Sequence, residues 1–347
     1  MRPNLNTITF NQKLISFLSG QTTPAISRYM SEKEIPFIAE SPNSRKRYSF
    51  EDTRNVIKHF AADQLIVKEK VQVFFNFKGG TGKTSLCHQV AVHLTLLGFK
   101  VLAIDCDPQA HLSSTFGFNE YSDDLTLYDV LINGVDISSI IKPVYPGLDV
   151  IPSNLSMTTV EIPFSQKANR EKLLSKFLQP LKSSYDFILL DTNPTISNLN
   201  QSITYSSDRL NIVCETQPYS LKGLNMLVKE IQDFSREMEH SINYCIIPNK
   251  YESKTVTSQE ALGTLRHEYK EVVLESLVRK CEDINISAQK KLPIHAFAAP
   301  KSIAMEDIKD LTNELVIKST TKKDINNEST QKTSLKLETK RNINESR

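Results

Sequence analysis

The sequence predicts an α/β protein built on a mainly parallel, doubly wound sheet. Short aliphatic runs alternate with longer amphipathic segments from residue 71 to about residue 317, and a glycine-rich loop follows the first run. Two later runs end in an aspartate, at Asp105 and Asp191. This alternation is typical of a parallel sheet covered by helices on both faces, with its ligand site beyond the carboxyl ends of the strands.

The individual elements follow from the same patterns. Aliphatic and aromatic runs predict strands over residues 71–77, 101–105, 148–151, 187–191, 210–214, 244–247 and 272–277. Apolar residues at helical spacing predict helices over residues 84–98, 167–178, 221–239, 256–269 and 302–317.

Composition divides the chain into three regions. Residues 1–68 read as a small helical module with net positive charge, 69–317 as the α/β domain, and 318–347 as a polar tail expected to be disordered. The 347 residues carry a net charge of only +2, which excludes no class of partner because local basic patches still bind nucleic acid. No signal peptide or membrane-length apolar run is evident. A cytoplasmic protein is expected, with buried free thiols at Cys87, Cys106, Cys214 and Cys245.

The glycine-rich loop reads Lys78-Gly79-Gly80-Thr81-Gly82-Lys83-Thr84, between an expected strand and an expected helix. Glycines let backbone N–H groups turn inward at a helix N-terminus, which makes an anion site. Lys83 would then face the β- and γ-phosphates, the Thr84 hydroxyl would ligate Mg²⁺, and Ser85 would complete the phosphate site. A glycine-rich turn can also be purely structural, but the strand–loop–helix order with Lys-Thr favours a nucleoside triphosphate.

Carboxylates follow two of the other expected strands. Asp105 and Asp107 are two residues apart after the run 101–105, so both would point toward the phosphate loop. Asp107 would orient the attacking water, although an Asp-Pro turn or helix cap is the plainer alternative. Asp105 and Asp191 would help to hold Mg²⁺, Asp191 through a water.

Together these motifs resemble the ParA/MinD superfamily of P-loop NTPases with a deviant Walker A loop, and most closely the ParA-type partition ATPases. The resemblance covers roughly residues 70–317 and is carried by KGGTGKT at 78–84, DCDPQ at 105–109 and DTNP at 191–194. Stretches 125–131, 150–154 and 218–224 support it.

The resemblance implies ATP and Mg²⁺ as cofactors and an ATP-dependent homodimer. Lys78 would reach across that dimer to the partner's phosphates, Asp107 would position the hydrolytic water, and Pro248 and Asn249 would contact adenine. Two departures concern nucleotide-dependent switching: Asn193 replaces the first of two usual prolines, and Ala110-His111 stands where many members have Gly-Asn.

The N-terminal region reads as a helix–turn–helix over 13–20 and 24–31, with Ser27, Arg28 and Tyr29 exposed. A turn and three cations, Arg45, Lys46 and Arg47, precede a helix over 50–62. This order resembles the winged helix–turn–helix of longer plasmid ParA proteins, which implies operator binding. The alternative is a docking or dimerisation arm whose cations are merely solvated.

A second basic cluster lies in the C-terminal half. The pairs Arg279-Lys280 and Lys290-Lys291 would supply non-specific DNA contacts, or would simply form an ordinary solvated surface. In the tail, Leu335 and Leu337 are two residues apart and share no helical face, which argues against a membrane-targeting helix.

The predicted function is therefore a cytoplasmic, nucleoid-associated, Mg²⁺-dependent partition ATPase. It would dimerise on ATP, bind DNA and hydrolyse ATP when a ParB-type partner stimulates it, without membrane association. Two alternatives remain: a nucleotide-controlled transcriptional repressor with incidental hydrolysis, and a spatial regulator like MinD.

Overall fold

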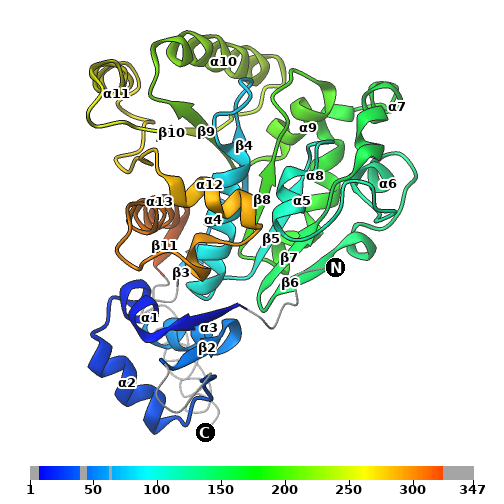
Figure 1. Cartoon of the computed structure of the whole chain (residues 1–347). Helices are drawn as coiled ribbons and strands as arrows, with labels where there is room; N and C mark the ends of the chain where they lie inside the picture. Colours follow the sequence, from blue (N-terminus) through cyan, green and yellow to red (C-terminus); the bar gives the residue numbers. More distant parts are fainter. Residues whose placement is uncertain (1–7, 40–44, 62–64, 323–347) are drawn as a thin grey trace, which may run out of the picture.

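The computed structural model describes residues 8–39, 45–61 and 65–322. Its centre is a sheet of seven strands in the order β10-β9-β4-β8-β5-β7-β6 (Figure 1). All neighbouring pairs are parallel except β6 and β7. The strands are β4 Val71–Phe75, β5 Val101–Asp105, β6 Lys142–Tyr145, β7 Leu148–Ile151, β8 Phe187–Asp191, β9 Arg209–Glu215 and β10 Tyr244–Asn249.

Each face of the sheet is covered by helices, so the predicted doubly wound α/β class is confirmed. Successive strand residues enter opposite cores: Val101 and Ala103 join one cluster, whereas Leu102 and Ile104 join the other. The first core includes buried residues of α4 (Lys83–Leu96) and α13 (Ile303–Ser319), and the second those of α8 (Leu173–Leu178), α9 (Asn198–Ser206) and α10 (Pro218–Glu237). The other helices of the domain are α5 His111–Thr115, α6 Leu127–Leu131, α7 Glu161–Ser165, α11 Val256–Glu268 and α12 Glu282–Lys290.

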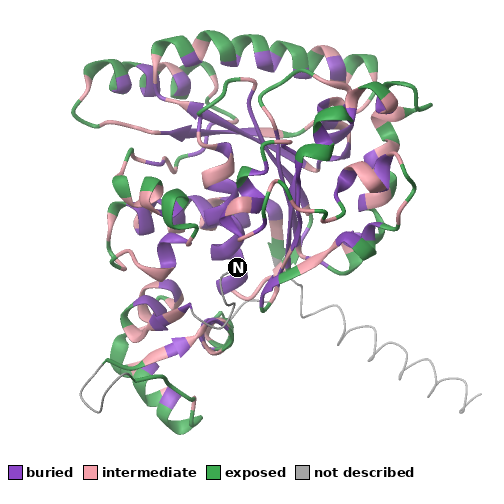
Figure 2. Cartoon of the chain, turned by 45° about the vertical axis from the view of Figure 1, so that its right-hand side comes forward, coloured by how far each residue is buried: buried purple, intermediate pink, exposed green. Residues whose placement is uncertain are grey.

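Helix α4 occupies the centre of the molecule. Its residues are buried on almost every side, in agreement with the purple centre and green rim of Figure 2. A helix that is covered all round tolerates little rotation or translation. It therefore gives the phosphate loop at its N-terminus a rigid support.

One predicted strand is wrong. Residues 272–277 run beside β10 but form only isolated contacts, such as the Leu274 N–H donating to the Ile246 carbonyl at 2.9 Å. The reason is Pro248, because a proline has no N–H with which to continue the ladder. The N–H groups of Glu275 and Ser276 bind the Glu314 carboxylate instead.

The ordered chain also extends past residue 317, where the tail was expected to begin. Helix α13 continues to Ser319, and β11 (Thr320–Lys322) pairs antiparallel with β3 (Leu65–Val67). The rest of the expected tail, 323–347, lies outside the described residues. The helix expected over 167–178 is observed as a 3₁₀ turn, Arg170–Lys172, followed by α8.

The N-terminal module contains helices α1 (Gln12–Ser19), α2 (Thr23–Glu32) and α3 (Phe50–Phe60), close to the expected positions. Two short strands, β1 (Thr9–Asn11) and β2 (Arg47–Ser49), pair antiparallel beside them.

This module is packed against the α/β domain. Arg54 donates a hydrogen bond to the Gly98 carbonyl at 2.8 Å, and Lys309 donates to the Phe17 carbonyl at 2.8 Å. The buried side chains of α1–α3 belong to the same core cluster as those of α4. The module and the domain thus share one hydrophobic core.

Two further expectations concern composition. Cys87, Cys106, Cys214 and Cys245 are buried free thiols, as expected. Across the described ranges, no helix has both the length and the apolar character needed to span a membrane.

Candidate nucleotide-binding site

The phosphate loop connects β4 to α4 at the carboxyl end of the sheet. Gly80 and Gly82 have φ of 75° and 95°, a conformation that glycine adopts without strain. Gly82 also has no room for a side chain, because a Cβ there would lie 2.4 Å from the Asn249 Nδ2 atom. Both the backbone conformation and the close approach of Asn249 therefore favour glycine at position 82.

Lys83 begins α4 and is only 6% exposed. Its ammonium donates to the Lys78 carbonyl at 3.3 Å. Burial lowers the pKa of Lys83, while the charges of Asp191 and Asp107 oppose that shift. The three predicted site residues are therefore close enough to affect one another electrically.

Asp191 ends β8, where the strand registers place it beside Phe74 of β4 and Asp105 of β5. It is fully buried, and its carboxylate lies beside the Thr84 hydroxyl. Burial, and secondly the charge of Asp105, raise the pKa of Asp191, whereas Thr84 and Lys83 oppose the shift. A buried carboxylate beside the Thr84 hydroxyl is a donor set that fits hydrated Mg²⁺.

Asp105 is also buried, but both of its oxygens are occupied. One accepts the Asp107 N–H at 3.0 Å, and the other accepts the N–H and hydroxyl of Ser113 at 2.8 and 2.7 Å. Burial raises the pKa of Asp105 to about 6. These hydrogen bonds fix the backbone of the loop that carries Asp107, and the expected role of Asp105 as a metal ligand stays a prediction.

Asp107 itself is nearly buried at the edge of this loop. Its side chain accepts the Gln109 N–H at 2.9 Å, which orients the carboxylate. Its charge acts on Lys83 of the phosphate loop, where it raises the pKa of that lysine against the effect of burial. This geometry suits the predicted task of orienting a water near the terminal phosphate.

Asn249 lies against the phosphate loop. Its side-chain amide donates to the Thr81 carbonyl at 2.6 Å, and it is 4% exposed. Pro248 lies beside Cys214 of the neighbouring strand β9. The two residues expected to contact adenine therefore sit in β10, with Asn249 bracing the loop.

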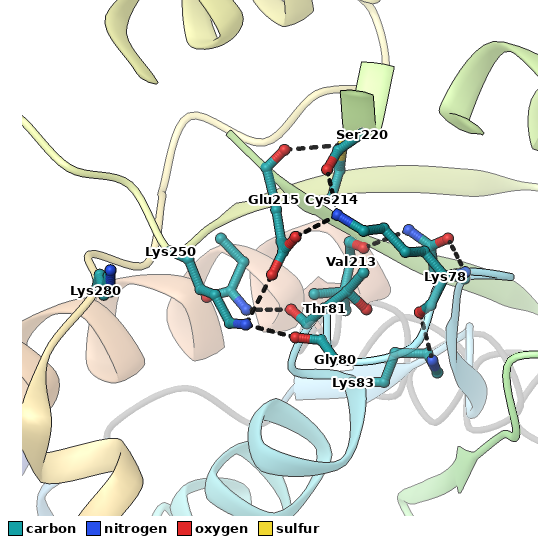
Figure 3. A network of polar contacts seen from close by, with 12 residues as sticks. Lys78, Gly80, Thr81, Lys83, Val213, Cys214, Glu215, Ser220, Lys250 and Lys280 are labelled. Carbon is teal, nitrogen blue, oxygen red and sulfur yellow. Dashed lines mark hydrogen bonds and ion pairs between the residues drawn. The ribbon is translucent and has the colours of Figure 1, made fainter. Parts of the chain in front are cut away.

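Lys78 is turned toward a neighbouring strand (Figure 3). Its ammonium lies 2.7 Å from the Glu215 carboxylate and donates to the Ser220 hydroxyl at 3.1 Å. Lys250 binds the other oxygen of the same carboxylate at 2.7 Å and the Gly80 carbonyl at 2.5 Å. Sequence reasoning missed Glu215 and Lys250, although Glu215 follows the run 210–214 as Asp105 and Asp191 end theirs.

The C-terminal basic candidates differ in how far their side chains are already engaged. Arg279 is held by Asp307, with Nη2 to Oδ1 at 2.5 Å, and by Glu306. Its guanidinium joins the chain after β10 to α13 and is not free for DNA. Lys280 pairs with Glu252 at 3.0 Å, Lys290 lies 5.4 Å from the centre of the Phe297 ring, and Lys291 is exposed at the end of α12.

The N-terminal candidates divide in the same way. Ser27 and Arg28 are exposed on α2, and Arg45 and Lys46 are exposed before β2. Arg47 instead donates to the hydroxyl and carbonyl of Thr9 at 2.6 and 2.5 Å, so it joins β2 to β1. Tyr29, expected to be exposed, is partly buried, and its ring stacks on that of His59 at 4.3 Å.

The chain is similar to known proteins over most of its length. Residues 69–244, just over half of the chain, match the family described as an AAA domain. The cell division protein PomZ of Myxococcus xanthus is 31% identical over 247 residues, which are 71% of this chain and 77% of PomZ. The virulence plasmid ParA family protein pGP5-D of Chlamydia trachomatis is 30% identical over 250 residues, 70% of this chain and 92% of that protein.

A solved structure is also similar to this chain. A plasmid partition protein of Borrelia burgdorferi bound to AMPPNP superposes with a TM-score of 0.61 at 25% identity, covering 72% of this chain and 100% of that one. The resemblance inferred from the three motifs is thereby confirmed. The chain belongs to the ParA/MinD superfamily of P-loop ATPases.

Proposed function

We propose that this partition or positioning ATPase dimerises when it binds ATP, binds DNA as a dimer, and hydrolyses ATP when a ParB-type partner stimulates it. The observation that carries the proposal is the difference between the two lysines of one loop. Lys83 is 6% exposed and faces its own phosphate site, whereas the Lys78 side chain is 47% exposed at the loop entrance. The exposure of Lys78 beside the phosphate site supports the proposal that it reaches the phosphates of a second copy.

The residues divide the work in the following way. The loop N–H groups and Lys83 would hold the phosphates, and Thr84 and Asp191 would hold Mg²⁺. Bound Mg²⁺ would neutralise charge that develops on the phosphate oxygens during hydrolysis. Asp107, fixed through Asp105, would hold the attacking water in line.

The test compares three lysine variants of the full-length chain. Lys83→Ala should lose ATP binding in equilibrium dialysis, because it removes the buried charge from the phosphate site. Lys78→Ala should keep ATP binding but stay monomeric in sedimentation experiments with ATP and Mg²⁺. Lys229→Ala, which changes an exposed lysine on α10, is the control and should dimerise normally. Dimerisation of Lys78→Ala at the wild-type ATP concentration would contradict the proposal.

A second candidate, a nucleotide-controlled repressor, is supported by the exposed cations of the N-terminal module. Arg28, Arg45 and Lys46 are solvent-exposed, and cations in such positions can contact phosphates. Removing the whole module would expose the core that it shares with α4, so point substitutions are the cleaner test.

The variant Arg28→Ala/Arg45→Ala/Lys46→Ala should bind DNA from upstream of its own gene more weakly. In a plot of log affinity against log salt concentration, the slope should become shallower by about one for each cation that bound a phosphate. Binding to unrelated DNA with ATP should persist if Lys280 and Lys291 contribute to it. Unchanged binding of both DNAs would leave the N-terminal module as a packing element.

A further inference from the structure

Glu215 joins three parts of the nucleotide site through one carboxylate. It ends β9, and its two oxygens bind Lys78 and Lys250, each at 2.7 Å (Figure 3). Lys78 is also bound by the Ser220 hydroxyl at the start of α10, and Lys250 by the Gly80 carbonyl of the phosphate loop. We call these five residues the Glu215 latch.

The Glu215 carboxylate is partly buried, and the two ammonium groups are more exposed. The Glu215 side chain is 13% exposed, against 47% for Lys78 and 42% for Lys250. Burial alone would raise the pKa of Glu215, but hydrogen bonds and charges from Lys250 and Lys78 hold it below its usual value. Glu215 is therefore an anion around neutral pH, and it needs a cation beside it.

We propose that Glu215 is a positioning residue that holds Lys78 against its own chain and so sets the ATP concentration at which the protein dimerises. This inference rests on the proposed function, in which Lys78 must reach a second copy. A lysine ammonium cannot keep its bond to Glu215 while it extends to phosphates on another molecule. Dimerisation must therefore break one of the two ion pairs of Glu215.

Lys250 makes it feasible for Lys78 to leave Glu215. A buried carboxylate left without any partner is strongly unfavourable, but Glu215 keeps Lys250 after Lys78 departs. Lys250 also remains bound to the Gly80 carbonyl, so the phosphate loop need not change with it. The two lysines thus have separate tasks: Lys250 neutralises Glu215, and Lys78 is exchanged.

Substitutions of Glu215 and of Lys250 should shift the ATP concentration needed for dimerisation in opposite directions. Glu215→Gln keeps the shape but removes the charge that holds Lys78, so half-maximal dimerisation should occur at about threefold to tenfold less ATP. Lys250→Met leaves Lys78 as the main counter-ion of Glu215, so dimerisation should require several-fold more ATP. Glu215→Asp keeps the charge and should restore a requirement closer to wild type.

The matched control is Glu252→Gln. Glu252 pairs with Lys280 at 3.0 Å, another carboxylate–lysine contact, and is not part of the latch. Its ATP requirement should equal that of wild type. Sedimentation over an ATP titration with Mg²⁺, in an Asp107→Ala background that slows turnover, measures the four variants on one scale.

A second measurement separates this inference from the proposed function. Without nucleotide, acetylation of Lys78 by an amine-reactive reagent, followed by mass spectrometry, should be several-fold faster in Glu215→Gln than in wild type or Glu252→Gln. Faster acetylation with a lower ATP requirement supports the inference. An unchanged acetylation rate, or an unchanged ATP requirement in a protein that does dimerise, overturns it.

If wild type and variants all remain monomeric with ATP, the proposed function fails. Faster acetylation in that case supports the hold of Glu215 on Lys78 but overturns the link to dimerisation.

Discussion

The Asn249 side-chain amide donates a hydrogen bond to the Thr81 carbonyl at 2.6 Å, across 168 positions of sequence. This contact ties the end of β10 to the middle of the phosphate loop. It leaves no space at Gly82, and it explains why the loop keeps a defined shape although three of its seven residues are glycine.

Gly82→Ala should therefore disrupt the site more than an ordinary change at a left-handed glycine. Gly134 has a similar φ of 74° but nothing within 4 Å of a new Cβ, so Gly134→Ala measures the backbone strain alone. That strain should be about 1 kcal/mol, and Gly82→Ala should lose a further 1–3 kcal/mol of unfolding free energy through the clash with Asn249. Urea unfolding of both variants checks the difference, and equal losses would show that Asn249 moves aside freely.

Asp191→Asn should stabilise the protein without nucleotide while abolishing Mg²⁺-dependent nucleotide binding. The raised pKa means that the ionised carboxylate opposes folding: its stabilising contribution is present below the ordinary carboxyl pKa and is lost as pH rises through the raised value. The Asp191→Asn change should therefore raise the free energy of unfolding by about 1–2 kcal/mol at pH 7.

Asp105→Asn is the matched comparison, because the two carboxylates are neighbours in the sheet register. Asp105 accepts three hydrogen bonds, and an amide NH₂ would oppose at least one of those donors. The expected loss is about 1–3 kcal/mol. The midpoints of thermal and urea unfolding at pH 7 should thus rise for Asp191→Asn and fall for Asp105→Asn. Parallel shifts would contradict the assigned roles.

Asp107→Ala should remove turnover but leave ATP binding and folding nearly unchanged. Among the described residues, the Asp107 side chain accepts one hydrogen bond, from the Gln109 N–H, so alanine removes little that stabilises the fold. Loss of a positioned carboxylate should slow phosphate release about 10²–10⁴-fold and lengthen the lifetime of ATP-bound dimers on DNA. Phosphate release and DNA dissociation are the measurements. Normal turnover in Asp107→Ala would contradict the proposal that Asp107 orients the attacking water.

Acid should destabilise the protein through the buried pair His93 and His295, whose rings are joined at 3.0 Å. Burial lowers the pKa of His93 to about 3 and that of His295 further below its usual value. The unfolded chain therefore binds more protons than the folded one below about pH 6.5, and stability falls as pH falls. Each histidine should contribute a loss of about 2 kcal/mol between pH 7.5 and pH 5.

Urea unfolding of wild type and His93→Gln/His295→Gln at these two pH values checks this loss. The variant should be less sensitive to pH, whereas His267→Gln, an exposed change on α11, should behave as wild type. Asp105 and Asp191 act in the opposite direction over part of this range, so the difference between variants is the informative quantity. Equal pH sensitivity of all three proteins would contradict the assignment.

Much of the fold and the centre of the site could be predicted from the sequence, because local signals there agree with the tertiary structure. Strands β5, β7 and β8 have the expected bounds, since each is a short run in which most side chains are aliphatic and buried. The strand expected at 272–277 fails because its pairing depends on Pro248, far away in sequence. Three-residue strands such as β3 and β11 carry no periodicity that a sequence pattern could reveal.

The same distinction applies to the site residues. Motif spacing indicates that Lys83, Thr84 and Asp191 meet, but not which carboxylates already have hydrogen-bond partners. Asp105 was therefore expected as a ligand, and only the structure shows that it already accepts hydrogen bonds from Asp107 and Ser113. Ion pairs between distant segments, such as Arg279 with Asp307, also cannot be predicted by counting the cations in the sequence.

The pairing of β11 with β3 fixes where attachments to this ATPase must emerge. Strand β3 leads into β4 at the end opposite the phosphate loop, so Lys322, which pairs with Leu65 of β3, lies on the far side from the nucleotide site. A fluorescent label or surface tether joined beyond Lys322 would hold the molecule by its base and leave the phosphate face open to solution. Immobilised single molecules prepared in this way should remain free to recruit a second copy.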